Sequence, residues 1–375
     1  MGLLETGSIV RVAAALALSL ALFAALADAH EVSPVPSLPA AAQALPMITS
    51  GRSQRGANGA FLRQWPGTYF ETAFRGGDAF FEVGPGDVGL RIVVDGDPAV
   101  PLVKPAPGFY RIEGLGTGSH RVRVDVASES QAGPTGFGGF YAAPGAKPMR
   151  LAHHAHQIEF IGDSYTAGYG NTSATRQCTE DEVWTTTDAS RGIAPLTAAH
   201  YDADYQVNAI SGRGIVRNYD GFAGDALPGM YPYVLFDKAD VYRDPAWRPR
   251  VIAIGLGTND FSTALHPGER WKTRDELHAD YEASYVRFVQ VLRAGNPHAW
   301  FTLWTTDGGD GEVKAEVARV IDLLHQSGET RVDMVAVPGL AMSACNYHPS
   351  VADDASIAAA LTSAIDSHRV IWDER

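Results

Sequence analysis

From residue 51 onward, the pattern of apolar and polar positions changes once, at about residue 150. Before that point, short segments alternate between apolar and polar residues and are separated by Gly and Pro. The segment 120–126 alternates strictly, which predicts a strand with one buried face, and further strands are predicted at 69–74 and 89–94. We interpret residues 51–148 as an antiparallel β-sandwich domain.

The later part of the chain, 155–375, alternates short apolar runs with amphipathic stretches. The runs lie at 158–161, 205–209, 251–256, 300–304 and 332–337. Continuous apolar runs are typical of strands that are buried on both faces. The clearest helix is predicted to begin with a capping box formed by Thr273 and Glu276 and to end at Gly295. This alternation predicts an α/β domain with a parallel sheet, which binds its ligand at the carboxyl ends of the strands.

The amino-terminal residues fit neither pattern. Arg11 precedes an apolar run, 12–26, which is followed by the A-x-A sequence at 27–29. The run has the length of a secretory h-region and is short for a bilayer span. We therefore expect residues 1–29 to be a signal peptide and the mature protein to be secreted or periplasmic, without a membrane; a retained anchor is the alternative. Residues 30–50 are rich in Pro and Ala and are expected to be a spacer.

Composition narrows the class of protein. Of the 375 residues, 45% are hydrophobic, which is enough for a sizeable core and excludes a mostly disordered chain. The net charge of −13, with no cluster of Lys and Arg, argues against binding of nucleic acid. The two cysteines, Cys178 and Cys345, are a candidate disulfide in an oxidising compartment, and buried free thiols are the alternative.

Four loops hold candidate catalytic residues. Ser164 follows the first predicted parallel strand and precedes a helix, where its hydroxyl can face the edge of the sheet. Gly212 and Asn259 follow the next two strands, and His348 lies before a helix near the end of the chain. Glycine lets a backbone N–H approach a ligand closely, and an Asn amide can donate to an oxyanion. Each residue alone also has an ordinary structural explanation as a turn, a helix cap or a structural histidine.

Together and in this order, the four blocks resemble the SGNH (GDSL-type) hydrolases. The blocks are I-G-D-S-Y-T-A-G-Y-G, N-A-I-S-G, G-T-N-D and Y-H-P. The W-P-G-T-Y-F-E segment at Trp65 and the G-D-S-x-T-x-G-Y-G form are similar to carbohydrate esterase family two, across about residues 51–365. The resemblance implies an all-β jelly-roll sandwich followed by a flavodoxin-like SGNH hydrolase domain with a parallel sheet.

The resemblance also implies roles for the matching residues. Ser164 would be the nucleophile and His348 the general base. The backbone N–H groups of Ser164 and Gly212 and the side-chain amide of Asn259 would form the oxyanion hole. Family members often carry an Asp two or three residues before the histidine, but this chain has Asn346 and Cys345 there. We therefore expect a backbone carbonyl to orient His348, as the resemblance implies for members with a catalytic dyad.

Two tyrosines also depart from the family pattern. Tyr165 and Tyr347 stand where the family often has an aliphatic residue and Trp, and both are candidates for substrate binding because an aromatic ring can stack on a sugar. No metal or cofactor is expected. The histidine tract at 153–156 is interpreted as a solvated linker rather than a metal site.

The expected function is that of an exported esterase that removes acetyl groups from polysaccharides or oligosaccharides. Two alternatives remain. The first is a lipid-ester or thioester hydrolase, which would need a longer apolar channel than the polar and Gly-rich loops after Ser164, Gly212 and Asn259 indicate. The second is a non-catalytic carbohydrate-binding protein, against which the intact set of candidate catalytic residues argues.

Overall fold

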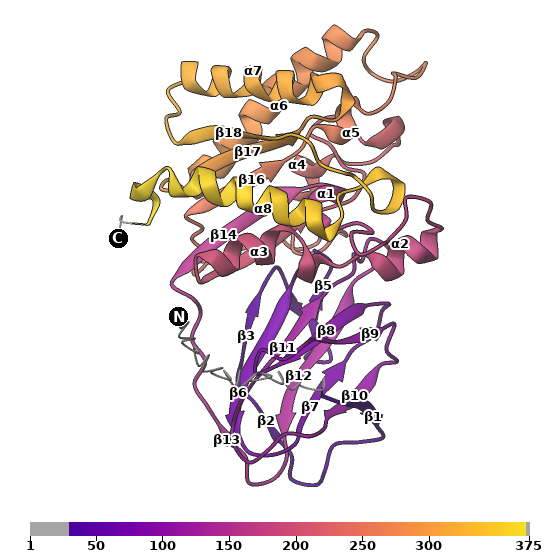
Figure 1. Cartoon of the computed structure of the whole chain (residues 1–375), viewed down its shortest axis with the longest axis vertical. Helices are drawn as coiled ribbons and strands as arrows, with labels where there is room; N and C mark the ends of the chain where they lie inside the picture. The colour runs from indigo at the N-terminus through magenta and orange to yellow at the C-terminus, as the bar shows by residue number, and fades with distance from the viewer. Residues whose placement is uncertain (1–29, 373–375) are drawn as a thin grey trace, which may run out of the picture.

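Two antiparallel sheets form the amino-terminal domain of the computed structural model, which describes residues 30–372 (Figure 1). One sheet has the strand order β1-β10-β7-β12-β5-β4, with β2 on β12, and the other has the order β13-β6-β11-β8-β9, with β3 on β6. The strands are β1 (Val32–Val35), β2 (Gln43–Ala44), β3 (Met47–Ser50), β4 (Gln54–Arg55), β5 (Phe61–Arg63), β6 (Tyr69–Arg75), β7 (Ala79–Val83), β8 (Gly89–Val94), β9 (Val100–Val103), β10 (Gly108–Ile112), β11 (Ser119–Val126), β12 (Thr135–Ala142) and β13 (Lys147–Pro148). The predicted antiparallel sandwich is confirmed.

Residues 30–50 belong to this sandwich, and the expectation that they form a spacer is wrong. Three strands lie in this stretch: β1 pairs with β10, β2 with β12 and β3 with β6. Leu45 is buried, and Val32 and Met47 pack against the sandwich core. The stretch lacks an apolar period because short edge strands are held by hydrogen bonds to their neighbours and tolerate Pro. The expected signal peptide, 1–29, lies outside the described residues.

A parallel sheet of five strands forms the centre of the second domain. Its order is β15-β14-β16-β17-β18, in agreement with the predicted parallel α/β fold. The strands are β14 (His156–Gly162), β15 (Ala203–Ala209), β16 (Val251–Gly255), β17 (Trp300–Thr306) and β18 (Val332–Val337). Gly162 pairs with Ala209 on one side and with Gly255 on the other, so β14, β15 and β16 end at the same level.

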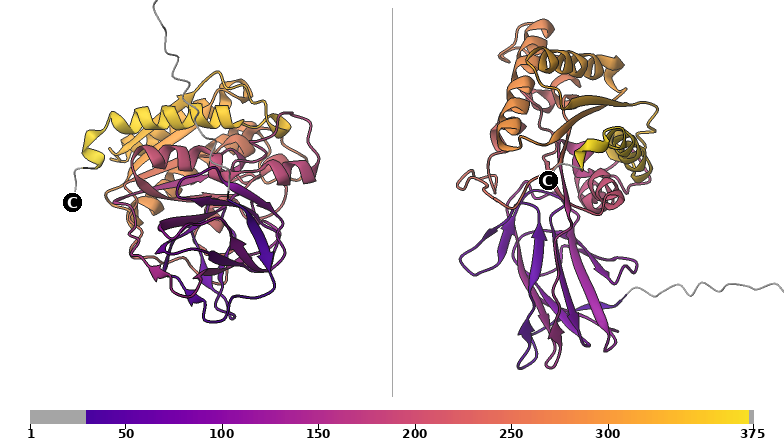
Figure 2. Two further views of the ribbon diagram at one scale, coloured as in Figure 1. Left: turned by 60° about the horizontal axis from the view of Figure 1, so that its bottom comes forward. Right: turned by 90° about the vertical axis from the view of Figure 1, so that its left-hand side faces the viewer.

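Helices cover both faces of the parallel sheet (Figure 2). Residues of α6 and α7 share one hydrophobic cluster with the sheet, and residues of α3 and α8 share another. The helices are α1 (Ser164–Ala167), α2 (Glu180–Thr186), α3 (Ile193–His200), α4 (Leu227–Met230), α5 (Thr258–Phe261), α6 (Arg274–Gly295), α7 (Glu312–Gln326) and α8 (Val351–Asp366). Short 3₁₀ turns lie at Ala189–Arg191, Tyr219–Gly221, Gly309–Gly311, Cys345–Tyr347 and Arg369–Ile371. Within residues 30–372, no helix has the length and apolar character needed to cross a bilayer.

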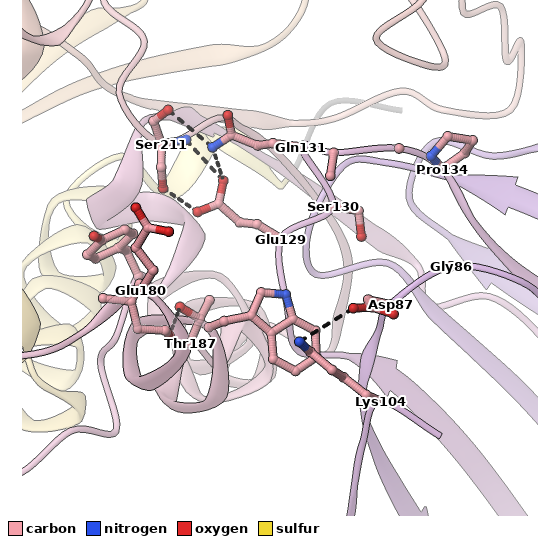
Figure 3. Close-up of a pocket in the computed structure, with 15 residues that line it drawn as sticks. Gly86, Asp87, Lys104, Glu129, Ser130, Gln131, Pro134, Glu180, Thr187 and Ser211 are labelled. Atoms are coloured by element: carbon pink, nitrogen blue, oxygen red, sulfur yellow. Dashed lines mark hydrogen bonds and ion pairs between the residues drawn. The ribbon is translucent and has the colours of Figure 1, made fainter. Parts of the chain in front are cut away.

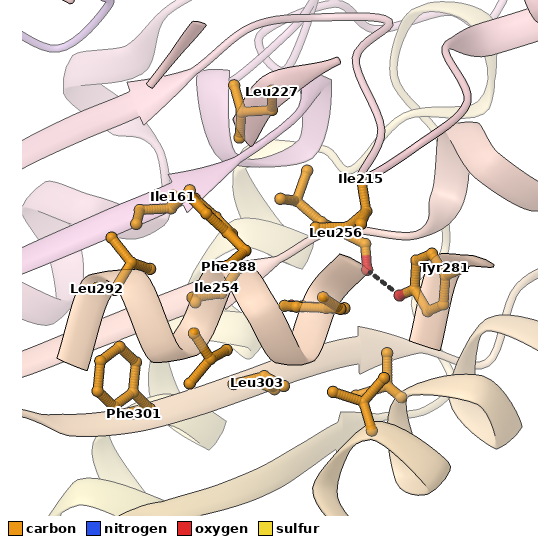
Figure 4. Close-up of a cluster of buried hydrophobic side chains, with 14 of the residues drawn as sticks. Ile161, Ile215, Leu227, Ile254, Leu256, Tyr281, Phe288, Leu292, Phe301 and Leu303 are labelled. Carbon is orange, nitrogen blue, oxygen red and sulfur yellow. Dashed lines mark hydrogen bonds between the residues drawn. The ribbon is translucent and has the colours of Figure 1, made fainter. Parts of the chain in front are cut away.

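Helix α6 shows how the core supports a strand-end loop. Its predicted amphipathic face is buried against β16 and β17 (Figure 4). Thr273 caps the helix by accepting the N–H of Glu276, but the Glu276 carboxylate accepts the N–H of Lys272, so the predicted capping box is only half formed. The Tyr281 hydroxyl donates to the carbonyl of Leu256 at 3.0 Å, which anchors the loop that follows β16.

Buried polar contacts join the two domains. Arg52 of the sandwich pairs with Glu159 of β14 at 3.4 Å, and both side chains are 2% exposed. The Tyr69 hydroxyl donates to Asp204 at 2.6 Å, and Arg91 donates to Asp188 at 2.9 Å. Removal of one partner from such a contact leaves an uncompensated buried polar group, which is strongly destabilising. The contacts therefore hold the sandwich in one orientation against the sheet.

Candidate active site

The end of β14 positions the candidate nucleophile. Asp163 caps helix α1 by accepting the N–H of Tyr165 at 3.1 Å, and Ser164 is the first residue of that helix. Gly162 packs so closely that a Cβ there would lie 1.9 Å from the Thr166 hydroxyl, so the turn requires glycine. Ser164 is 6% exposed at this sharp strand-to-helix turn. The local sequence thereby fixes the position of its hydroxyl.

His348 lies against this hydroxyl, although 183 residues separate the two in the chain. Its Nε2 is 2.9 Å from Ser164 Oγ. Its Nδ1 is 3.0 Å from the carbonyl oxygen of Cys345 and 3.1 Å from that of Asn346. Carbonyl oxygens can only accept, so they select the tautomer with a proton on Nδ1 and leave Nε2 free to accept the serine proton. The expected orientation of His348 by backbone carbonyls is present in the structure.

The loop before His348 has an unusual backbone. Asn346 and Tyr347 both adopt left-handed conformations, with φ of 51° and 61°, which few residues other than glycine do. The Asn346 N–H donates to the carbonyl of Arg176 at 2.7 Å. A disulfide joins Cys345 to Cys178, so the predicted pair of cysteines is brought together. These contacts hold the carbonyl groups that face the histidine.

Two backbone N–H groups, in the loops that follow β14 and β15, remain available to a ligand. Gly212 has φ of +82°, and its N–H, like that of Ser164, donates to no other residue in the described part of the chain. Asn259 is 5% exposed, and its amide nitrogen donates to Asp163 at 3.1 Å and to the carbonyl of Arg213 at 3.0 Å. Both amide hydrogens of Asn259 are thus engaged, and donation to an oxyanion requires one of these bonds to be shared or released.

Comparison with known proteins identifies the family. Residues 49–151 match the model of the carbohydrate esterase 2 N-terminal domain, and residues 160–357 match that of the GDSL-like lipase/acylhydrolase family. An acetylxylan esterase / glucomannan deacetylase of Cellvibrio japonicus is 45% identical over 314 residues, which are 84% of this chain and 87% of the relative. This chain belongs to carbohydrate esterase family 2. The resemblance drawn from the four sequence blocks is confirmed.

Solved structures agree with this assignment. The esterase has a TM-score of 0.83 and 42% identity to a carbohydrate esterase whose active site displays divergent catalytic and non-catalytic binding functions; the match covers 88% of this chain and 100% of that one. A family two carbohydrate esterase from Clostridium thermocellum in complex with cellohexaose has a TM-score of 0.77 at 26% identity, over 87% of this chain and 100% of that one.

The sandwich domain of the esterase contacts Ser211, in the loop after β15 that also carries Gly212, and sequence reasoning missed this contact. The carboxylate of Glu129 accepts hydrogen bonds from the backbone N–H of Ser211, at 3.0 Å, and from its hydroxyl. Gln131 donates to the carbonyl of Ser211 at 3.3 Å. Burial raises the pKa of Glu129. Because Ser211 directly precedes Gly212, these contacts fix the peptide that presents the Gly212 N–H.

Three tyrosines of the esterase lie next to His348 in space or in sequence. The ring of Tyr165 meets that of His348 edge-on, with centroids 5.3 Å apart. Tyr347 is 62% exposed at the rim, and the Arg176 guanidinium lies 4.8 Å from the centre of its ring. Tyr169, which was not singled out from the sequence, lies 4.3 Å from the His348 ring and accepts a hydrogen bond from the Asn346 side chain. Its only sequence signal was its place in the block that contains Ser164.

The histidine tract does not converge on a metal position. His153 pairs with Asp204, His154 with Asp202, and His156 with the carbonyl of Tyr201. These three acceptors differ, and no group of three potential metal ligands exists within residues 30–372. The interpretation of the tract as a solvated linker is wrong for His156. This residue is the first of β14: its backbone pairs with Ala203, and its ring packs on Trp372.

We expect removal of the Asn346 side chain to leave the esterase active. In Asn346→Gly, which tolerates the left-handed φ, and in Asn346→Ala, kcat/KM for an acetyl ester should stay within about tenfold, because both carbonyl acceptors of Nδ1 remain. His348→Ala is the matched control and should fall to background. A folded Asn346→Gly variant that loses about a thousandfold would falsify the backbone-held dyad.

The esterase should also remain active in acid. Burial lowers the pKa of His348 to about 4, partly offset by the two backbone carbonyls, and these hydrogen bonds include no carboxylate to stabilise the imidazolium. The base must be neutral, and a lowered pKa keeps it neutral until the pH falls below that value. The acidic limb of kcat/KM, measured as acetate release between pH 3 and 8, should therefore lie near pH 4. A limb at the ordinary histidine value of about 6.5 would contradict this assignment.

Proposed function

We propose that this esterase removes acetyl groups from the hydroxyls of plant-type polysaccharides of the xylan or glucomannan class, with Ser164 as nucleophile and His348 as general base. The observation that carries the proposal is the 2.9 Å contact between His348 Nε2 and Ser164 Oγ. The carbonyl groups keep the proton on Nδ1, so Nε2 can only accept, and the hydrogen bond runs from the Ser164 hydroxyl to Nε2. Nucleophile and base are therefore within hydrogen-bond reach, as serine catalysis requires.

The reaction proceeds in two steps. Ser164 Oγ attacks the acetyl carbonyl carbon while His348 Nε2 takes its proton, and the oxyanion is stabilised by the N–H groups of Ser164 and Gly212 together with the Asn259 amide. The intermediate collapses to acetyl-serine as the bond to the sugar oxygen breaks, and the His348 imidazolium protonates that oxygen, so the sugar leaves with a free hydroxyl. Water then attacks the acetyl-serine with His348 as base, which releases acetate and restores Ser164.

The substrate class is supported by the relatives and by the open rim of the site. The relative from Cellvibrio japonicus is an acetylxylan esterase / glucomannan deacetylase, and the relative from Clostridium thermocellum was solved with cellohexaose. The exposed ring of Tyr347 at the rim suits a sugar face. A long acyl chain instead needs an enclosed apolar channel, and loops rich in Gly and polar residues follow the three catalytic strands.

We further propose that the esterase acts after export. Structural disulfides such as that between Cys178 and Cys345 are typical of oxidising compartments, and the apolar run at 12–26 has the features of a signal peptide. Sequencing of the amino terminus of the exported protein should find His30 as its first residue. Recovery of a membrane-bound chain that retains residues 1–29 would contradict this prediction.

Ser164→Ala should abolish acetate release from acetylated xylan and glucomannan. Its melting temperature should stay within about 3 °C of wild type, because a strand-end hydroxyl contributes little to the core. The wild type should prefer nitrophenyl acetate over nitrophenyl octanoate by more than about tenfold in kcat/KM. A preference for octanoate would instead support a lipid-ester hydrolase, and full activity of Ser164→Ala would remove the proposed nucleophile.

A further inference from the structure

A cavity of about 590 Å³ lies between the sandwich and helix α2 (Figure 3). Both domains line it. The sandwich contributes Asp87, Lys104 and Gln131, and the hydrolase domain contributes Tyr169, Glu180 and Trp184. Neither the nucleophile nor the base lines this cavity, so it is a separate space beside the site described above.

Two lining residues connect the cavity to the catalytic dyad. Tyr169 lies on the cavity wall, and its ring centre is 4.3 Å from that of His348. Ser211 also lies on the wall and directly precedes Gly212, whose N–H faces the developing oxyanion in the proposed mechanism. A polymer with one unit at Ser164 therefore has a neighbouring unit within reach of the cavity.

Trp184 gives the cavity an aromatic wall. It lies on α2, and its ring is partly exposed. Its indole N–H donates to no acceptor within residues 30–372 and is available to a sugar hydroxyl. The Lys104 ammonium lies 4.6 Å from the ring centre and is itself 3.4 Å from Asp87. A partly exposed aromatic ring beside polar groups is the arrangement that binds a sugar, whose faces are apolar and whose edges carry hydroxyls.

Helix α2, which carries Trp184, is fixed at its start by a capping box and by the disulfide before it. Thr179 and Glu182 form a complete capping box at its start. Cys178, immediately before this cap, is bonded to Cys345 of the histidine loop. The Trp184 platform and the base are therefore tied to each other by one covalent connection, which fixes the spacing between the cavity and the reacting centre.

The charges around the cavity favour a neutral ligand. Three carboxylates line it, those of Asp87, Glu129 and Glu180, against the single ammonium of Lys104, which Asp87 already pairs. A uronic acid would bring a further negative charge into this field and be repelled, whereas sugar hydroxyls can donate to carboxylates.

We propose that this cavity is a subsite for a neutral sugar unit adjacent to the acetylated unit, with Trp184 as its stacking platform. The inference rests on the proposed function, because it takes the substrate to be an acetylated glycan. It gives the sandwich domain a direct part in substrate selection through Asp87, Lys104 and Gln131. The sugar units of the substrate would then be recognised in this cavity, and the acetyl group at Ser164.

The test compares two substrates on Trp184→Ala: an acetylated xylo- or manno-oligosaccharide, and nitrophenyl acetate, which is too small to reach the cavity. The ratio of kcat/KM for the oligosaccharide to that for nitrophenyl acetate should fall about tenfold, mainly through KM, as the loss of one stacking contact implies. Trp184→Phe keeps an aromatic face and should recover most of the ratio. An unchanged ratio in Trp184→Ala would overturn the subsite.

Trp372→Ala is a matched control. Trp372 is a partly exposed tryptophan that packs on His156, at the end of β14 opposite to Ser164, and its removal should leave the ratio at the wild-type value. A wild type that hydrolyses nitrophenyl acetate but releases no acetate from either oligosaccharide would refute the proposed function itself. An active wild type with an unaffected Trp184→Ala ratio refutes only the subsite.

Inhibition distinguishes the class of sugar. Unacetylated xylotetraose or mannotetraose should inhibit acetate release by the wild type, and about tenfold more weakly in Trp184→Ala. Tetragalacturonate at the same concentration should not inhibit. Equal or stronger inhibition by tetragalacturonate would overturn the assignment to neutral sugars.

Discussion

The parallel register of three strands is the constraint on which the active site depends. β14 lies between β15 and β16, and the pairing of Gly162 with Ala209 and Gly255 brings the three strand ends to one level. Parallel strands point their carboxyl ends the same way, so the loops that follow them converge at one edge. Slippage of any strand would separate Ser164 from Gly212 or Asn259. The buried face of α6 packs against this sheet and supports the alignment.

His348, the proposed base, is held by the main chain instead of by a carboxylate. Two carbonyl groups accept from His348 Nδ1, and two consecutive left-handed residues, Asn346 and Tyr347, aim the loop that carries them. Such a backbone costs energy and persists only when its surroundings hold it. The disulfide at Cys345 and the hydrogen bond from Asn346 to Arg176 provide that support. Because neutral carbonyls stabilise an imidazolium less than a carboxylate does, burial controls the pKa of this base.

The two domains meet beside the candidate active site. The sandwich contributes Glu129, which accepts the N–H of Ser211 next to Gly212, and it forms part of the wall of the cavity that Trp184 also lines. The contact between Arg52 and Glu159 is almost inaccessible to solvent, so a change in the relative position of the domains would expose or unpair two buried charges. The position of the sandwich therefore affects the position of the Gly212 peptide.

The sequence by itself determined both fold classes, the parallel strands after residue 150 and the four blocks that contain Ser164, Gly212, Asn259 and His348. These features are encoded locally, in apolar periods and in short turns that admit few residues. Tertiary structure decided what depends on contacts between distant segments: the strands within 30–50, the hydrogen bonds between Glu129 and Ser211, and the cavity at α2. Edge strands are specified by the partner's hydrogen bonds, and interdomain contacts by the packing of two surfaces, so neither leaves a period in the chain.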